Sequence, residues 1–121
     1  MAHTGYLTSA EQAALDATIR SAEQACRAEI SVYVGKSDGE DPRAFATSLH
    51  NTLVAPPRSI LVMVDPEKRV VEIVTGGHVR RTLSDAEAAL AVEEMTRSFA
   101  EGDLAGGLRR GITLLAEHAR S

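Results

Sequence analysis

The most constraining feature of the sequence is an apolar run at residues 60–64, which follows Ser59. A strand with one face toward the core and the other toward water alternates apolar and polar side chains, whereas this run is apolar on both faces. Strands of this kind lie in the middle of a sheet that is covered on both sides. The run therefore predicts helices above and below a sheet. The chain has 121 residues, so we expect one domain over residues 1–121, with residues 1–8 flexible.

Hydrophobic periodicity and turn signals predict the order α-β-α-β-β-α-α. Capping boxes begin the first helix at Thr8 or Ser9 and a later helix at Ser84. Because a helix joins the first two strands, these strands should be parallel, and a tight turn makes the third strand antiparallel. The fold class is a three-layer α-β-α sandwich, a small mixed sheet with helices on both faces. The predicted elements are helix 9–26, strand 28–36, a helix from Pro42 to before Pro56, strands 59–64 and 69–75, and helices beginning after Ser84 and Asp103.

The composition narrows the possible partners and the compartment. The net charge of −4 argues against nucleic acid, which usually needs a basic field. No apolar stretch approaches the roughly 18 residues of a membrane span, and no secretory signal is visible, so we expect no membrane insertion and a cytoplasmic location. The only cysteine, Cys26, lies in an apolar helical stripe and should be a core residue.

Chain direction predicts where a binding site would form. The two parallel strands begin at the same end of the sheet, and the antiparallel third strand finishes there. Arginine forks and the exposed amides of a Gly-Gly corner suit a phosphate or carboxylate. Alternatively, the glycines only turn the chain and the arginines are only solvated. The candidate ligand-binding residues are Glu29, Arg58, Ser59, Thr75, Gly76, Gly77, His78, Arg80, Arg81 and Asp85.

No catalytic, cofactor or metal site is predicted. His78 could act as a general acid or base with Glu29 as its nearest partner, but a single histidine beside a strand end is more often a surface residue. The other histidines, His3, His50 and His118, lack the spacing of a zinc site. At the opposite end of the sheet, carboxylates could gather a hard cation but lack EF-hand spacing, so we expect a solvated acidic rim. These carboxylates are Asp38, Glu40, Asp41, Asp65 and Glu67.

Three glycines stand inside the last predicted helix, at positions 106, 107 and 111. Each costs up to about 1 kcal/mol relative to alanine in an exposed helix. Close approach of this helix to another element explains them, and a self-associating surface is the alternative.

The ordered set of these pieces resembles the TPM domain family. The resemblance covers residues 28–115 and rests on five stretches: residues 28–34, the apolar second strand at 59–64, residues 69–76, Leu83-Ser84-Asp85, and residues 99–108 with the pattern F-x-x-G-D-x-x-x-G-L. It implies the same α/β sandwich. Family members include acid phosphatases of photosynthetic membranes, photosystem repair factors and accessory proteins of membrane receptors. This chain is most similar to the short, soluble bacterial members, which have no assigned role.

One difference from the TPM pattern determines which function we expect for this chain. The family often has Asp-Asn-Gly before its second strand, where this chain has Pro57-Arg58-Ser59. Without that carboxylate we expect a non-enzymatic binding or accessory domain that contacts a protein or a small anion. The alternative is a phosphoester hydrolase in which arginines hold phosphate and His78 or Asp85 moves protons. A self-associating structural module is a third possibility, and no oligomeric state is predicted.

Overall fold

The computed structural model describes residues 5–120 and has the predicted order of helices and strands. It adds two short 3₁₀ turns around the candidate site. The helices are α1 (Ser9–Cys26), α2 (Pro42–Asn51), α3 (Asp85–Ala100) and α4 (Leu104–Ala119). The strands are β1 (Glu29–Val34), β2 (Ser59–Asp65) and β3 (Val70–Thr75), and the 3₁₀ turns are η1 (Pro56–Arg58) and η2 (Val79–Arg81).

The sheet has the strand order β1-β2-β3, with β2 in the middle as predicted. Strand β1 runs parallel to β2 and places Glu29 opposite Ser59. Strand β3 runs antiparallel to β2 and places Thr75 opposite Ile60. The beginning of β1, the beginning of β2 and the end of β3 therefore share one end of the sheet.

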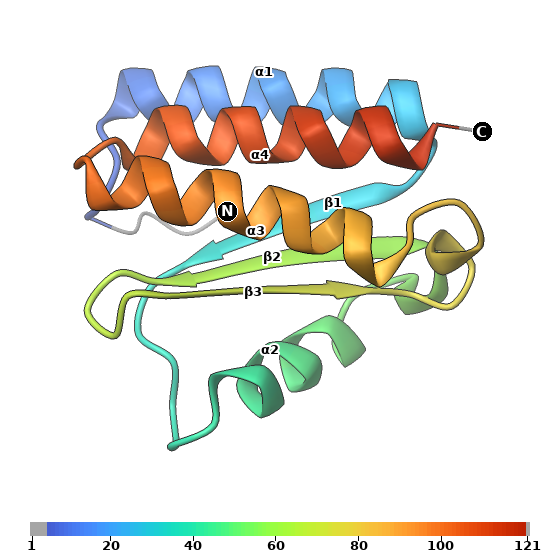
Figure 1. Ribbon diagram of the computed structural model, residues 1–121, viewed down its shortest axis with the longest axis horizontal. Coiled ribbons are helices and arrows are strands. Elements are labelled where there is room, and N and C mark those ends of the chain that lie inside the picture. The colour runs from blue at the N-terminus through green and yellow to red at the C-terminus, as the bar shows by residue number, and fades with distance from the viewer. Residues whose placement is uncertain (1–4, 121) are drawn as a thin grey trace.

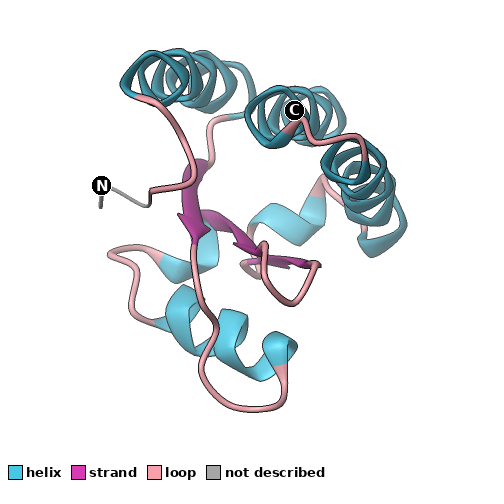
Figure 2. Ribbon diagram, turned by 90° about the vertical axis from the view of Figure 1, so that its left-hand side faces the viewer, coloured by secondary structure: helices cyan, strands magenta, loops and turns pink. Residues whose placement is uncertain are grey.

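Helices cover both faces of the sheet, so the three-layer architecture is confirmed. Helices α1, α3 and α4 cover one face, and α2 lies on the other (Figures 1 and 2). Every residue of β2 is buried. Its side chains alternate between two apolar clusters: Ile60, Val62 and Val64 pack in the cluster with α1, α3 and α4, whereas Leu61 and Met63 pack in the cluster with α2. The two-sided apolar run thus joins both halves of the core.

Side-chain caps begin each of the four helices. Thr8, not Ser9, caps α1, and Ser84 caps α3, each in a capping box with the glutamate three residues on. Asp41 caps α2 and Asp103 caps α4. Within the segment 1–8 that was expected to be flexible, residues 1–4 lie outside the described residues. Leu7 is buried in the core next to the cap.

Helix α2 is shorter than predicted and ends before the prolines. The amide and the hydroxyl of Thr52 both donate to the carbonyl of Leu49, which tightens the last turn. The chain then crosses an irregular segment to η1. The sequence pattern missed this end because Leu53 continues the apolar stripe and is half-buried against the α2 cluster.

Helices α3 and α4 pack closely at the glycines of α4. A Cβ atom on Gly107 would lie 2.7 Å from Cβ of Ser98, and one on Gly111 would lie 2.5 Å from Cγ of Met95. Both distances are too short for carbon atoms that do not bond. Close approach to α3 therefore explains Gly107 and Gly111, which are buried. Gly106 is different, because a Cβ there would lie 2.3 Å from Oδ2 of Asp103, the cap of its own helix.

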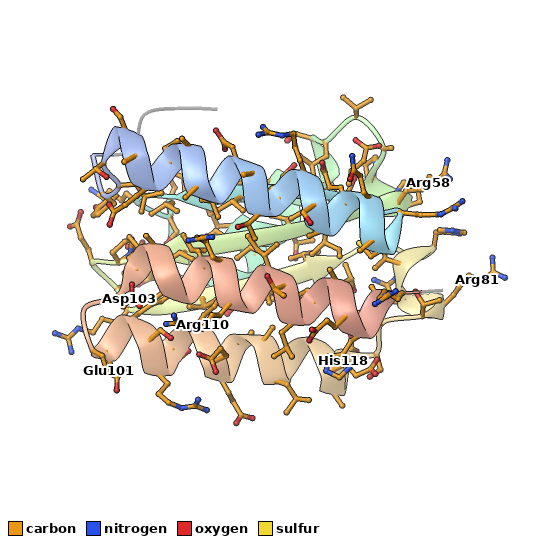
Figure 3. The ribbon with its side chains drawn as sticks, turned by 90° about the horizontal axis from the view of Figure 1, so that it is seen from above. Arg58, Arg81, Glu101, Asp103, Arg110 and His118 are labelled. Carbon is orange, nitrogen blue, oxygen red and sulfur yellow. The ribbon has the colours of Figure 1, made fainter. Side chains whose placement is uncertain are left out.

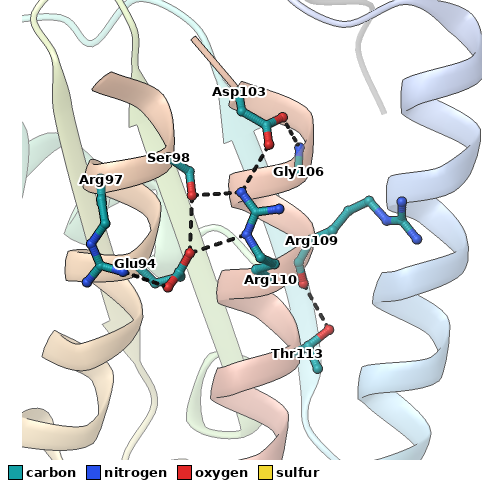
Figure 4. A network of polar contacts seen from close by, with 8 residues as sticks. All are labelled: Glu94, Arg97, Ser98, Asp103, Gly106, Arg109, Arg110 and Thr113. Atoms are coloured by element: carbon teal, nitrogen blue, oxygen red, sulfur yellow. Dashed lines mark hydrogen bonds and ion pairs between the residues drawn. The ribbon is translucent and has the colours of Figure 1, made fainter. Parts of the chain in front are cut away.

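A polar network joins the same two helices at the end of the molecule where they connect (Figure 4). The Arg110 guanidinium donates to Glu94 at 3.2 Å, to Ser98 at 2.8 Å and to Asp103 at 3.0 Å. Asp103 also accepts from the amide of Gly106 at 2.9 Å. The hydrogen bonds from Arg110 and Gly106 lower the pKa of Asp103. The aspartate of the pattern F-x-x-G-D-x-x-x-G-L is therefore the cap of α4, and Arg110 links it to Glu94 on α3.

Two further predictions concern Cys26 and membrane-spanning helices. Cys26 is buried, and its burial raises the pKa of the thiol, as expected for a core residue. No helix within residues 5–120 is both long enough and apolar enough to cross a membrane.

Candidate functional site

Three segments that are far apart in the sequence meet at one end of the sheet (Figure 1). Glu29 pairs with Ser59 across β1 and β2. The amide of Gly76 donates to the carbonyl of Ser59 at 3.0 Å, and the amide of His78 donates to the carbonyl of Pro57 at 2.9 Å. The backbone therefore brings together the candidate residues of all three strands.

Gly76 is required by packing rather than by a special backbone angle. A Cβ atom at this position would lie 2.0 Å from the carbonyl oxygen of Pro56 and 2.4 Å from that of Pro57. Its φ is not positive, so the conformation itself is open to other residues. Gly77 is different, because a Cβ there would meet only the guanidinium of Arg80, at 3.8 Å. Gly76 therefore allows close packing against η1, and neither glycine has a positive φ.

Three of the candidate residues, Ser59, Thr75 and Gly76, are buried. The hydroxyl of Ser59 donates to the carbonyl of Ala55 at 2.7 Å. The carbonyl of Thr75 accepts a hydrogen bond from the guanidinium of Arg80. These contacts hold η1 and η2 against the sheet, so the buried residues support the site rather than face a ligand.

His50 is a supporting residue that sequence reasoning missed. It is buried on α2, and its Nε2 lies 3.0 Å from the carbonyl oxygen of Ser59. A carbonyl only accepts, so Nε2 carries the proton in this contact. The signal in the sequence was spacing: His50 follows the apolar Ala46 by four residues, which places both side chains on one helix face.

The other seven candidate residues are exposed. Arg58 and Arg81 point outward at this end, opposite the end that carries Glu101 and Asp103 (Figure 3). Arg27, which directly follows α1, is also exposed here and was not predicted. We call the surface formed by Arg27, Arg58, His78, Arg80 and Arg81 the basic end.

Most cations of the basic end have no partner within residues 5–120. The side chains of Arg27, Arg58 and Arg81 make no hydrogen bond and no ion pair with any described residue. The exposed carboxylates nearby, Glu29 and Asp85, make no ion pair with them either. A free guanidinium presents a planar fork of N–H donors that matches a carboxylate or a phosphate.

His78 forms no acid–base pair with a described residue, whereas Nδ1 of His118 on α4 lies 3.2 Å from Oε2 of Glu87 on α3. The ring of His78 makes no hydrogen bond with Glu29 or with any other residue among 5–120. The predicted neighbourhood of these residues therefore exists in the backbone, but their side chains do not bond. The exposed guanidinium groups of the basic end offer N–H donors to an anion.

The opposite end of the sheet is built around a buried carboxylate. Asp65 accepts from the amide and the hydroxyl of Ser37 at 2.8 and 2.7 Å and from the amides of Glu67 and Lys68 at 3.1 Å. Burial alone would raise the pKa of Asp65, but these hydrogen bonds outweigh it and lower the pKa below its usual range. Asp65 thus belongs to the core and was wrongly assigned to a solvated rim.

The remaining acidic residues at that end, Asp38, Glu40, Asp41 and Glu67, are exposed as expected. Asp41 is used as the cap of α2. In the part of the chain that the structure describes, no group of three or more His, Cys, Asp or Glu side chains is arranged to hold a metal ion.

Similar solved structures share this fold. The NMR structure of the BA42 protein from the psychrophilic bacterium Bizionia argentinensis superposes with a TM-score of 0.84 at 23% identity, over 93% of this chain and 81% of that one. The N-terminal domain of a protein from P. gingivalis gives 0.81 at 21% identity, over 93% and 76%. The N-terminal domain of the cg2496 protein from Corynebacterium glutamicum gives 0.80 at 19%, over 97% and 76%.

Curated relatives are found in Mycobacterium tuberculosis. The chain is 29% identical over 107 residues to "Uncharacterized protein MT2543" of strain CDC 1551 / Oshkosh and to "Uncharacterized protein Rv2468c" of strain H37Rv. The match covers 88% of this chain and 64% of each relative, so the chain spans less than two thirds of their length.

Residues 2–116 match the family model described as "Domain of unknown function (DUF5130)". Neither this description nor those of the relatives names the TPM domain, so that resemblance stays a prediction. The family match spans nearly the whole sequence. The chain therefore belongs to the DUF5130 family.

Proposed function

We propose that this domain is a non-catalytic binding module whose basic end contacts an acidic surface on another protein. The observation that carries the proposal is the absence of any bonded partner, within residues 5–120, for Arg27, Arg58 and Arg81. These arginines gather at one end of a chain whose net charge is −4. Complementary charge increases the rate and specificity of association.

The exposure of the side chains at the basic end supports a protein partner over a small anion. Small ligands usually bind in concave sites that bury most of their surface. Here the arginines are exposed, and Val54, which precedes η1, is 97% exposed. Arginine is enriched in protein interfaces.

The alternative of a phosphoester hydrolase has less support. It needs a phosphate held by Arg58 and proton transfer by His78 or Asp85. No described residue bonds to the His78 ring, and Pro57 stands where the TPM pattern has a carboxylate. Turnover of p-nitrophenyl phosphate that disappears in both His78→Ala and Arg58→Ala would favour the hydrolase over the binding module.

The proposal also covers the kind of protein and its location in the cell. We infer that the domain acts as a TPM-like accessory protein and that it works in the cytoplasm, where a lone free thiol such as Cys26 is stable. Fractionation of cells that produce the full protein tests the location.

The experiment that tests the binding surface is an NMR titration of the ¹⁵N-labelled chain with an octaglutamate peptide. We expect amide shifts confined to the segments around Arg27, Arg58 and residues 77–81. The same peptide should shift little in an Arg58→Glu/Arg81→Glu variant.

The matched control is Arg97→Glu, which reverses one charge on the exposed side of α3, where Arg97 pairs with Glu94. This variant should bind the peptide as the wild type does. Shifts spread evenly over the surface, or inorganic phosphate producing the same shifts at lower concentration than the peptide, would overturn the assignment of a protein partner.

A further inference from the structure

We propose that a second site, at the end of the domain away from the basic end, binds a small amphipathic carboxylate. The site is a cavity of about 340 Å³ between the β2–β3 hairpin and the connection from α3 to α4. Both segments lie at the end of the molecule that faces the viewer in Figure 2. The proposal is independent of the proposed function, because the two sites share no residue.

The walls of the cavity are mainly apolar and only partly buried. Val70, Val71, Phe99 and Leu104 line it and are half-buried. On their other side, Val71, Phe99 and Leu104 pack against the main core. The apolar wall is therefore held in place by the fold while part of it still faces the cavity. An apolar group that enters would remove this surface from water.

Arg69 supplies the single cation in the cavity wall. It lines the cavity, is exposed, and makes no side-chain hydrogen bond or ion pair with any residue among 5–120. Its φ of 56° lies in the left-handed region, which glycine occupies without strain. Arginine therefore occupies a position of the hairpin whose backbone conformation glycine would adopt without strain.

The acidic side chains around the cavity form no ion pair with Arg69, and this includes the exposed Glu101 between the lining residues Ala100 and Gly102. Asp65, the only acidic residue in the wall, remains charged, and its oxygens accept four hydrogen bonds from Ser37, Glu67 and Lys68. Asp103 pairs with Arg110 at 3.0 Å. None of these carboxylates pairs with Arg69, so the guanidinium is left for an anionic group of a ligand.

The size of the cavity limits the ligand. At roughly 30 Å³ per non-hydrogen atom, the volume share of a water molecule, 340 Å³ holds on the order of ten such atoms. A saturated chain of medium length with one terminal carboxylate meets both requirements. Its tail would contact Val71 and Phe99, and its carboxylate would accept hydrogen bonds from Arg69.

The test is an NMR titration of the ¹⁵N-labelled chain with octanoate, followed in parallel with octan-1-ol and octan-1-amine. We expect octanoate to shift the amides of residues 69–71, 99 and 104 and to bind more tightly than the other two compounds. Equal binding of octanoate and octan-1-ol would mean that Arg69 does not select a carboxylate and would overturn the proposal.

Two substitutions of Arg69 separate ligand binding from folding. Arg69→Gln should weaken octanoate binding roughly tenfold, as expected for the loss of a charge-assisted hydrogen bond. Arg69→Gly should weaken it equally while stabilising the fold, because it removes the left-handed strain. Arg20→Gln removes one charge on the exposed side of α1, outside both proposed sites, and should leave octanoate binding unchanged. Octanoate affinity that survives both Arg69 variants, or that falls in Arg20→Gln, contradicts the site.

Discussion

Gly76 donates its amide to the carbonyl of Ser59 at 3.0 Å, and this bond fixes the end of β3 against the beginning of β2. The same carbonyl lies 3.0 Å from Nε2 of His50 on α2. One backbone oxygen therefore ties together a helix and two strands. The exposed arginines that precede Ser59 and follow Gly76 are held at one end of the molecule as a result.

Gly76→Ala should destabilise the domain. The new methyl group would lie 2.0 Å from the backbone oxygen of Pro56, which cannot move aside as a side chain can. Overpacking of this kind typically costs about 1–3 kcal/mol in the free energy of unfolding. Urea denaturation measures the change. Gly77→Ala is the matched control and should be close to neutral, because its methyl group meets only Arg80 at 3.8 Å.

Asp65→Asn should lower the free energy of unfolding at neutral pH by about 1–3 kcal/mol, because it weakens hydrogen bonds made to a buried charged acceptor. Asp38→Asn, an exposed carboxylate without side-chain contacts among the described residues, is the control and should unfold like the wild type.

The Asp65 contribution should also depend on pH. The pKa of Asp65 is lowered in the folded state, so the unfolded chain binds the proton more tightly. The stabilisation is therefore complete above the unfolded pKa of about 3.9 and is lost as the pH falls through the lower folded value. Urea unfolding at several pH values should show the gap between wild type and Asp65→Asn narrowing below about pH 4. A gap that widens on acidification would reverse the assigned sign.

Gly107→Ala should be destabilising even though alanine favours helices. The gain in helix propensity is at most about 1 kcal/mol. The added methyl group would lie 2.7 Å from Cβ of Ser98 and 2.8 Å from a ring carbon of Phe99, so α3 and α4 would have to separate. Thermal unfolding of this variant should be compared with that of Thr113→Ala on the exposed side of α4. An equal melting temperature for the two variants would show that the helices do not need the glycine.

Much of the fold could be predicted because local patterns and chain connectivity agree. Residues 60–64 are apolar on both faces, and this pattern identified the central strand β2. The helix between β1 and β2 and the short turn after β2 then fixed all strand directions. Those strand directions predicted that Glu29, at the beginning of β1, and Gly76, after the end of β3, lie at the same end of the sheet.

The nature of the candidate site could not be predicted to the same extent. Whether Arg58 and Arg81 close over a ligand or point outward depends on the path of η1 and η2, which no local pattern shows. The need for Gly76 arises from the backbone of Pro56 and Pro57, which approaches it only in the folded chain. Burial of Asp65 was missed for a related reason, since its partner Ser37 comes from a distant loop.

The affinity of the octaglutamate peptide at low and high salt tests the central claim most directly. The account predicts binding that weakens between about 50 mM and about 300 mM sodium chloride and that falls roughly tenfold or more in Arg58→Glu/Arg81→Glu. In the Arg97→Glu control the affinity should equal that of the wild type. Binding that is insensitive to salt, or that is retained in the double variant, would contradict a basic end that recognises an acidic partner.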